Sequence, residues 1–420
     1  MSTGVAAVPR ESPAGRMLIV SVDCHAGPEG IADYRPYLDP AVRSRFDEYT
    51  SQVERFDARL GSGRMRLGGA GTRSETSGLW DTTVRRQDLD ADGVAGEVIF
   101  PQGGVPFGRY PAIGGGTSDP LRWEASSEER LAGPRAYNRW LADLCSEEPA
   151  RHHGVAVLPM REGIDAAVQE VQLAVSLGLK GGVSLPPVGD LAVKYNDRDY
   201  DRLWAVCQDL DAPLNLHGSA GQFYGGGPEE VGLILAETDF LSRRTLWFLI
   251  FSGVFERFPR LRLVVTEQRA HWVRPTLEEL DSIYRSRISE GLRAFLPKPP
   301  SEYFGQSCYV GGSFLSRAEC ENRHDIGLDR LMWGSDYPHT EGTWPWTMDS
   351  LRLALSGIPK SEAMAIVGEN AVRCYGFDEH ALRRTVRRIG PSVDAVMQPL
   401  AHVPEEGVAQ SWAFRTGIWD

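Results

Sequence analysis

Short apolar segments of strand length recur along this chain, and most are followed by a segment with the spacing of an amphipathic helix. Strands that alternate with helices predict parallel β/α units. A count of eight such segments favours a closed barrel over an open doubly wound sheet, and no glycine-rich phosphate loop follows the first segment to support the open sheet. Helical patterns cover Gly163–Leu177, Asp199–Leu210 and Trp272–Tyr284. The strand-like segments lie near residues 17–23, 96–101, 154–159, 180–185, 212–217, 261–267, 306–311 and 331–336.

The spacing of these segments predicts one distorted (β/α)8 TIM barrel over residues 17–377, with a long insertion at residues 26–95. Residues 1–16 are expected to form a flexible N-terminal segment. Residues 378–420 are expected to form a helical C-terminal extension that packs on the barrel or on a partner subunit. Within the insertion, the glycine-rich segment Gly61–Gly71 is predicted to be mobile, because glycine leaves the backbone free and the segment has few apolar anchors.

Charge and composition exclude several classes of function. The formal net charge of −12 argues against binding of nucleic acid, which requires basic patches. No apolar run approaches the roughly 20 residues that span a bilayer, and residues 1–16 lack the features of a signal peptide. The six cysteines form no CxxC pair, which is typical of reduced thiols. We therefore expect a cytoplasmic protein that binds neither nucleic acid nor membranes.

Ligand-type side chains stand at the ends of four of the predicted strands. Asp23 and His25 end the first, His217 ends the fifth, Glu267 ends the sixth, and Asp336 ends the eighth. The carboxyl ends of parallel barrel strands meet at one face of the barrel, where active sites are built. Imidazole and carboxylate groups together suit a catalytic divalent cation. The sequence therefore predicts a metal-dependent enzyme.

These motifs, with the segments around them, resemble the amidohydrolase-related family of the amidohydrolase superfamily. This family includes aminocarboxymuconate-semialdehyde decarboxylase and γ-resorcylate decarboxylase, and the resemblance covers most of residues 17–377. Its most specific part is Trp333-Gly334-Ser335-Asp336-Tyr337-Pro338-His339. Further matching segments are Tyr137-Asn138-Arg139-Trp140-Leu141, Leu177-Gly178-Leu179-Lys180-Gly181-Gly182, Arg257-Phe258-Pro259-Arg260-Leu261-Arg262, Glu341-Gly342-Thr343-Trp344-Pro345, Gly368-Glu369-Asn370-Ala371 and Tyr375-Gly376.

The resemblance implies one divalent metal ion, with Zn²⁺ as the leading expectation and Mn²⁺ or Mg²⁺ as alternatives. The implied ligands are Asp23, His25, His217 and Asp336. Family members carry an HxH or ExH pair where this chain has Asp23-Cys24-His25, so a carboxylate replaces one expected ligand. The resemblance also implies a homodimer or a higher homo-oligomer. Lys180 opens its strand instead of ending it, which excludes it as the bridging lysine of binuclear relatives.

Each of the other candidate residues has a functional and a structural interpretation. Asp336 is expected to bind metal or handle the proton, unless it caps a helix. Asp23 is either a ligand or the acceptor for a ligating histidine. Glu267 is either a general acid/base or the partner of Arg269 or another arginine. His339 is expected to orient Asp336 or the substrate. His271, which is alternatively a surface residue, and Trp344 are the candidate substrate-binding residues.

Two reactions of a small-molecule substrate fit this set of residues. Metal-activated water can hydrolyse a C–N or C–O bond of an organic acid, amide or lactone, and this is the reaction that we favour from the sequence. The alternative is non-oxidative decarboxylation of an aromatic or unsaturated carboxylic acid. A third hypothesis, an inactive barrel that only binds ligand, is disfavoured because all four ligand-type residues are present.

Overall fold

The computed structural model of the protein describes residues 15–60, 76–102, 104–108, 121, 123–186, 194–218, 229–408 and 412–417. The predicted mobile segment Gly61–Gly71 and almost all of the N-terminal segment 1–16 lie outside the described residues, so both expectations stay predictions.

Parallel strands form the centre of the described structure, in the orders β1-β2-β3 and β4-β5-β6-β7-β8-β9. Only Val155 separates β3 from β4, and its N–H donates to the carbonyl of Ile99 at 2.9 Å, so these two strands are one interrupted segment. The described residues therefore contain the eight strand segments that the sequence predicts. Their bounds are β1 (Ile19–Ala26), β2 (Val94–Pro101), β3 (His152–Gly154), β4 (Ala156–Val157), β5 (Val183–Ser184), β6 (Leu214–Leu216), β7 (Leu263–Thr266), β8 (Cys308–Ser313) and β9 (Leu331–Gly334).

The first and last strand segments meet at their carboxyl ends and close the barrel. The N–H of Asp336 donates to the carbonyl of Asp23 at 2.8 Å, and the N–H of His25 donates to the carbonyl of Tyr337 at 2.7 Å. A parallel bridge joins Cys24 to Tyr337 between these two bonds. We call this junction the β1–β9 seam. It brings two of the predicted metal ligands, Asp23 and Asp336, side by side.

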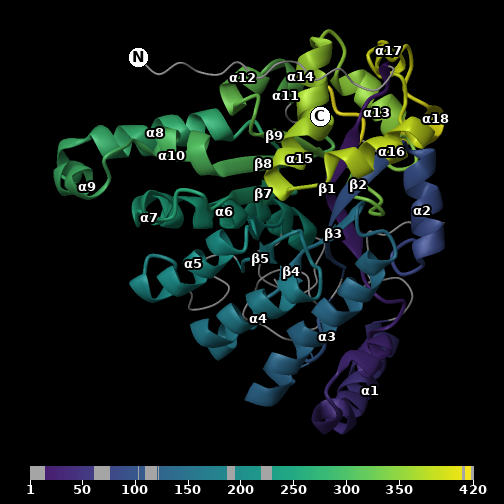
Figure 1. Cartoon of the computed structure of the whole chain (residues 1–420), viewed down its shortest axis with the longest axis vertical. Coiled ribbons are helices and arrows are strands. Elements are labelled where there is room, and N and C mark those ends of the chain that lie inside the picture. Colours follow the sequence, from purple (N-terminus) through teal and green to yellow (C-terminus); the bar gives the residue numbers. More distant parts are fainter. Residues whose placement is uncertain are drawn as a thin grey trace.

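Helices lie outside the strands, as Figure 1 shows for α3, α4 and α5. The helices α4 (Ile164–Ser176), α5 (Asp201–Asp209) and α8 (Val273–Arg285) confirm the three helical patterns predicted from the sequence. The others are α1 (Arg43–Leu60), α2 (Thr82–Ala91), α3 (Ser127–Ser146), α6 (Glu229–Phe251), α7 (Val254–Arg257), α9 (Glu290–Phe295), α10 (Pro300–Ser307), α11 (Arg317–Glu321), α12 (Arg323–Ile326), α13 (Thr347–Ala354), α14 (Lys360–Met364), α15 (Asn370–Tyr375), α16 (Glu379–Ile389), α17 (Val393–Val396) and α18 (Glu405–Val408). Short 3-10 helices are η2 (Ile31–Tyr37), η3 (Pro40–Val42), η4 (Met160–Glu162), η5 (Arg198–Tyr200) and η6 (Arg287–Ser289), and η7 (Ala365–Glu369) is a π-helix.

Local sequence explains where the helices of the insertion and of the barrel begin. The carboxylate of Asp81 accepts hydrogen bonds from the N–H groups of Thr83 and Val84, which starts α2. Ser126 and Glu129 form a capping box at the start of α3. Among the described helices, none has both the length and the apolar character that a bilayer crossing requires.

The barrel interior is filled by apolar side chains that alternate along the strands. Val20 and Val22 of β1, together with Val264 and Met332, are fully buried in one cluster. Leu382 and Val386 of α16 belong to the same cluster, so this C-terminal helix packs on the barrel. Figure 1 shows α16 beside β2. The polar residues at or just after the ends of β1, β6 and β9 lie at the carboxyl end of the barrel, beyond this apolar interior.

Candidate metal centre

Asp23 and His25 are both carried by β1 and are two residues apart, so their side chains leave the strand on the same face. His217 directly follows β6, and Asp336 stands two residues beyond β9. Each of these residues therefore extends from the carboxyl end of a parallel strand. The closed barrel brings all of them to one place, as the sequence predicted.

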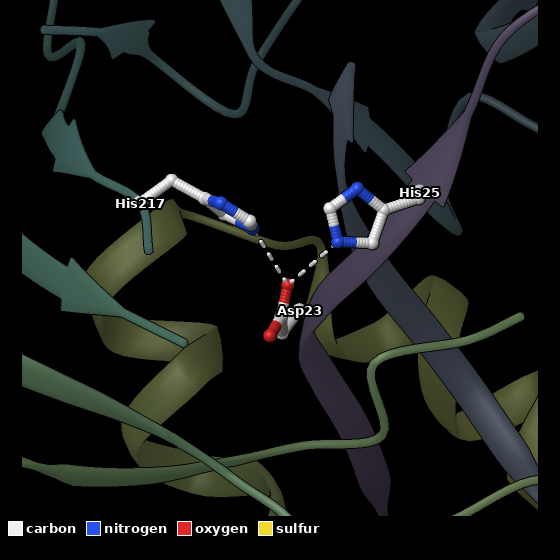
Figure 2. A group of neighbouring side chains, drawn as sticks. All are labelled: Asp23, His25 and His217. Carbon is white, nitrogen blue, oxygen red and sulfur yellow. Dashed lines mark hydrogen bonds and ion pairs between the residues drawn. The ribbon is translucent and has the colours of Figure 1, made fainter. Parts of the chain in front are cut away.

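The first group of ligand-type atoms consists of Asp23, His25 and His217, whose ligand atoms lie within 4.8 Å of one another. Figure 2 shows the two imidazole rings converging on one carboxylate oxygen. The Nε2 atom of His217 lies 3.2 Å from Asp23 Oδ1, and the Nε2 atom of His25 lies 3.5 Å from the same oxygen. The other oxygen of Asp23 accepts a hydrogen bond from the hydroxyl of Ser313.

The second group shares His25 with the first and adds Asp336 and His339. Asp336 Oδ1 lies 3.1 Å from His25 Nε2 and 2.8 Å from His339 Nδ1. The rings of His25 and His339 stack with their centroids 4.0 Å apart. Asp336 is fully buried, and beyond these two imidazoles its carboxylate has no hydrogen-bond partner among the described residues.

The donor set of these two groups fits a divalent cation. Two carboxylates and three imidazoles offer oxygen and nitrogen atoms, which suit Zn²⁺ or Mn²⁺. Buried polar atoms are ordinarily hydrogen-bonded, yet beyond the ion-pair contacts given above, His25 Nε2 and both carboxylate oxygens of Asp336 have no hydrogen-bond partner among the described residues. A cation held by Asp23, His25, His217 and Asp336 would satisfy these atoms. His339 then lies next to the ligands.

The electrostatic field of the site also favours positive charge. Burial alone would raise the pKa of Asp23, but hydrogen bonds with His217 and His25 outweigh it and hold this pKa well below its ordinary value. Burial opposes protonation of His339, but the adjacent Asp336 carboxylate raises the pKa of His339 to about 9. Burial and the repulsion from His339 oppose protonation of His25, but its contacts with the Asp23 and Asp336 carboxylates outweigh them and raise its pKa. The carboxylates of Asp23 and Asp336 thus stabilise positive charge on the imidazoles between them, and a metal ion that binds there would displace those protons.

Backbone strain occurs at two of the strand ends that carry these groups. Glu267 and Asp336 have φ angles of 55° and 57°, in the left-handed region that non-glycine residues rarely adopt. Such strain persists only where the surrounding structure imposes it, and it concentrates at functional sites. The strained turn at Asp336 is held by the seam bond to Asp23 and by a bond from the Thr343 N–H to the Ser335 carbonyl at 2.9 Å.

Comparison with known proteins identifies the family to which this barrel belongs. A family model described as Amidohydrolase matches residues 114–377, which is more than half of the chain. The chain belongs to the amidohydrolase family. This confirms the resemblance and the fold class predicted from the sequence, and it places the chain in a superfamily of enzymes.

Named relatives of this amidohydrolase include decarboxylases. The γ-resorcylate decarboxylase of Polaromonas sp. is 26% identical over 224 residues, which cover 49% of this chain and 65% of the relative. The chain thus spans less than two thirds of that relative's length. An amidohydrolase from Mycobacterium avium subsp. paratuberculosis has the same fold, with a TM-score of 0.62, 19% identity, and coverage of 87% of this chain and 100% of its own. A 5-carboxyvanillate decarboxylase from Novosphingobium aromaticivorans, solved with bound manganese, gives a TM-score of 0.61 at 18% identity, covering 86% and 97%.

The remaining predicted residues of the amidohydrolase site lie at different places. Glu267 pairs with His217, with 3.2 Å between Oε2 and Nδ1, so within the described part of the chain its ion-pair partner is a candidate ligand and not an arginine. Trp344 packs its ring edge-on against Tyr337 in the loop after Asp336, at 5.6 Å between centroids. His271 belongs to neither group of ligand-type atoms found in the described residues. It lies 4.0 Å from the buried carboxylate of Glu319 and lines a separate cavity of about 140 Å³.

Two residues of the amidohydrolase site were not predicted from the sequence. Ser313, at the end of β8, donates to Asp23. Gln102, the residue after β2, places its Oε1 atom 2.8 Å from His339 Nε2. Both stand at or just after the carboxyl end of a predicted strand, and this position was the available signal. Serine and glutamine are not metal ligands of the expected type, so this position alone does not single them out.

Close packing at Gly334 gives a test of how tightly this amidohydrolase holds its ligands. A Cβ atom on Gly334 would lie 2.6 Å from the Cβ of Asp23, so Gly334→Ala must push β9 away from β1. We expect the variant to lose about 1–3 kcal/mol of unfolding free energy and to bind metal more weakly. Urea titration and metal content measure the two effects.

Gly305→Ala is the control for this variant, because a Cβ atom at Gly305 in α10 meets open space. Gly357→Ala is not suitable, because the φ of 82° at Gly357 adds strain of its own. Native stability and metal content in Gly334→Ala would contradict this packing.

Proposed function

We propose that the chain is a metal-dependent, non-oxidative decarboxylase of an aromatic or unsaturated carboxylic acid. The proposal rests chiefly on Asp336, a fully buried carboxylate on a strained turn, in contact with His25 and His339 and otherwise without a hydrogen-bond partner in the described structure. The choice of reaction is supported by the decarboxylases among the named relatives. They favour the alternative reaction over the hydrolysis that we expected from the sequence, so hydrolysis is no longer the leading hypothesis.

Asp23, His25, His217 and Asp336 would hold the divalent ion. When bound, the ion would supply a positive centre for the substrate carboxylate and a neighbouring oxygen. The solved relative with manganese supports Mn²⁺ beside the Zn²⁺ that the sequence favoured. The carboxylate pair Asp23 and Asp336 adds hard oxygen donors, which suit Mn²⁺ and Mg²⁺.

The residues of the chain itself then have distinct tasks. Asp336 carries a solvent proton to the ring carbon that bears the carboxylate, and the bond to that carboxylate breaks as carbon dioxide leaves. The proton ends on carbon and the electron pair of the broken bond returns to the ring, so the charges balance. Glu267 orients His217 through their contact of 3.2 Å. His339 is held between Asp336 and Gln102, at 2.8 Å from each, and orients the Asp336 carboxylate.

An isotope experiment tests the reaction type. The purified protein, loaded with Mn²⁺ or Zn²⁺, is incubated in D₂O with a panel of hydroxybenzoic acids that includes 2,6-dihydroxybenzoate and 5-carboxyvanillate. We expect release of carbon dioxide together with one deuterium at the ring position that carried the carboxylate. A parallel panel of amides and lactones in H₂¹⁸O tests hydrolysis. Entry of ¹⁸O into a product carboxyl group, with no carbon dioxide from the acids, would overturn the proposal in favour of hydrolysis.

A further inference from the structure

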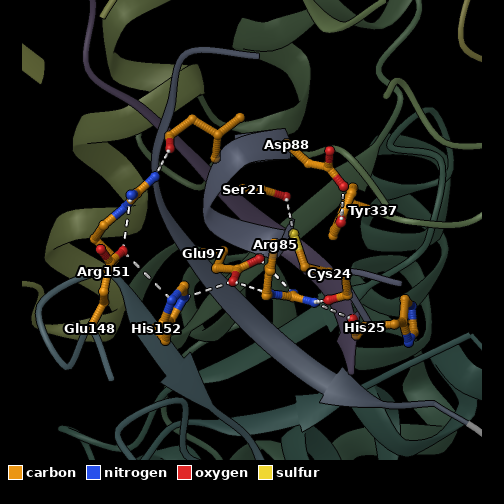
Figure 3. Close-up of polar contacts among 12 residues, drawn as sticks. Ser21, Cys24, His25, Arg85, Asp88, Glu97, Glu148, Arg151, His152 and Tyr337 are labelled. Carbon is orange, nitrogen blue, oxygen red and sulfur yellow. Dashed lines mark hydrogen bonds and ion pairs between the residues drawn. The ribbon is translucent and has the colours of Figure 1, made fainter. Parts of the chain in front are cut away.

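Arg85 lies on α2 of the insertion and is fully buried beneath the candidate metal centre. Its Nε and Nη2 atoms donate to the two carboxylate oxygens of Glu97 on β2, at 2.6 and 2.7 Å (Figure 3). The same carboxylate lies 2.8 Å from His152 Nδ1. A bidentate pair of this kind fixes the plane of the guanidinium group. Arg85 is therefore held rigidly against β2.

The third nitrogen of this guanidinium group, Nη1, reaches β1, the strand that carries the candidate ligands Asp23 and His25. Arg85 Nη1 donates to the carbonyl of His25 at 2.8 Å and to the carbonyl of Gly78 at 2.8 Å. His25 is a candidate ligand, so this bond fixes the main chain at the ligand itself. Gly78 belongs to the segment that precedes α2, and the bond ties this part of the insertion to the end of β1.

The same group also contacts the turn that carries Asp336. The guanidinium carbon of Arg85 lies 5.1 Å from the centroid of the Tyr337 ring, within the range of a cation–π contact. Tyr337 directly follows Asp336, and its hydroxyl donates to Asp88 of α2 at 2.6 Å. Its carbonyl accepts the seam bond from the N–H of His25. The buried guanidinium group of Arg85 thus contacts both sides of the β1–β9 seam.

We propose that Arg85 is a positioning residue, which sets the separation of His25 and Asp336 by holding the His25 carbonyl and the Tyr337 ring against β2. The inference rests on the metal site of the proposed function. Loss of the guanidinium group leaves the His25 carbonyl without its buried donor and frees the Asp336 turn on one side. Metal affinity then falls, because groups that orient ligands typically contribute about 10–100-fold to metal binding.

A matched control separates this role from general stabilisation. Arg257 also makes a bidentate pair, with Asp201, and also donates to two carbonyls, those of Ser252 and Gly253. None of the contacts that Arg257 makes with the described residues involves a candidate metal ligand. We therefore compare Arg85→Met with Arg257→Met in the full chain, measuring Mn²⁺ dissociation constants by electron paramagnetic resonance and stability by urea titration. Both variants should lose stability. Only Arg85→Met should bind Mn²⁺ at least about tenfold more weakly than the native protein.

The possible results distinguish this inference from the proposed function. Native protein that binds no Mn²⁺ or Zn²⁺ would overturn both. Native protein that binds Mn²⁺, with an unchanged dissociation constant in folded Arg85→Met, would overturn only the role of Arg85. If Arg85→Met does not fold, Arg85→Lys and Arg257→Lys decide the matter, since lysine keeps the charge beside the carboxylate but cannot bridge Glu97 and the His25 carbonyl in the same way. Equal Mn²⁺ affinities in the two lysine variants would overturn the positioning role.

Discussion

Asp336→Asn should lose turnover by about 10²–10⁴-fold while the barrel stays folded. The amide has the shape of the carboxylate, but it can neither balance the charge of a cation nor carry a proton to carbon. Asp336 is fully buried in contact with His25 and His339, so the substitution changes the centre of the site and not its solvent-exposed edge. Initial rates of carbon dioxide release, measured with the best acid of the panel, give the magnitude.

Asp92→Asn is a suitable control for this variant. Asp92 is also a buried carboxylate, and it accepts a hydrogen bond from the Thr347 hydroxyl at 2.6 Å, outside both groups of ligand-type atoms. Its substitution should change stability and leave turnover within a few-fold of native. If Asp336→Asn kept near-native turnover, Asp336 would not deliver the proton, and that role would fall to Glu267 or His339.

His217→Ala should remove the bound metal and leave the fold intact. His217 follows a strand of only three residues, its ring lies 4.4 Å from the ring of Phe100 between centroids, and its two polar contacts are with Asp23 and Glu267. Losing one of four ligands weakens the site by far more than the loss of these two contacts destabilises the barrel. Elemental analysis should give about one metal ion per native chain and close to none in the variant, with unchanged circular dichroism.

His271→Ala provides the comparison for this loss. It is the same substitution, made at a histidine that belongs to neither group of ligand-type atoms in the described chain. This variant should keep its metal, and a raised KM would support the substrate contact expected for His271. Undiminished metal in His217→Ala, or two metal ions per native chain, would exclude a single site built on His217.

The strand ends could be predicted because a buried parallel strand has a continuous run of apolar residues in its sequence. A polar residue that follows such a run therefore marks the end of the strand. The exact residues at which each strand begins and ends could not be predicted. The fourth predicted segment, 180–185, contains only the two-residue strand Val183–Ser184. Gly182 has a φ of 82°, which lies outside the β region and delays the start of the strand.

The residues around the predicted ligands depend on three-dimensional contacts that no local pattern encodes. The left-handed backbone at Glu267 redirects the chain, so the alternation of a strand cannot be continued from Glu267 to place His271. Arg85 lies on a helix of the insertion, and its contacts with Glu97 and His25 follow from how that helix packs on β1 and β2. Ser313 contacts Asp23 only because the barrel closes.

The candidate metal centre is complete only after β9 has joined β1 at the β1–β9 seam. Ser335 N–H donates to the Ser21 hydroxyl at 2.8 Å, across 314 residues of sequence, beside the pair Asp23 and Asp336. During synthesis, a growing chain that has exposed Asp23, His25 and His217 still lacks the strand that brings Asp336. Its site therefore cannot reach full affinity until the last strand has left the ribosome and docked. Metal at a hundred times its dissociation constant would then stabilise the closed barrel by about 2.7 kcal/mol, so a bound cation would hold β1 and β9 together.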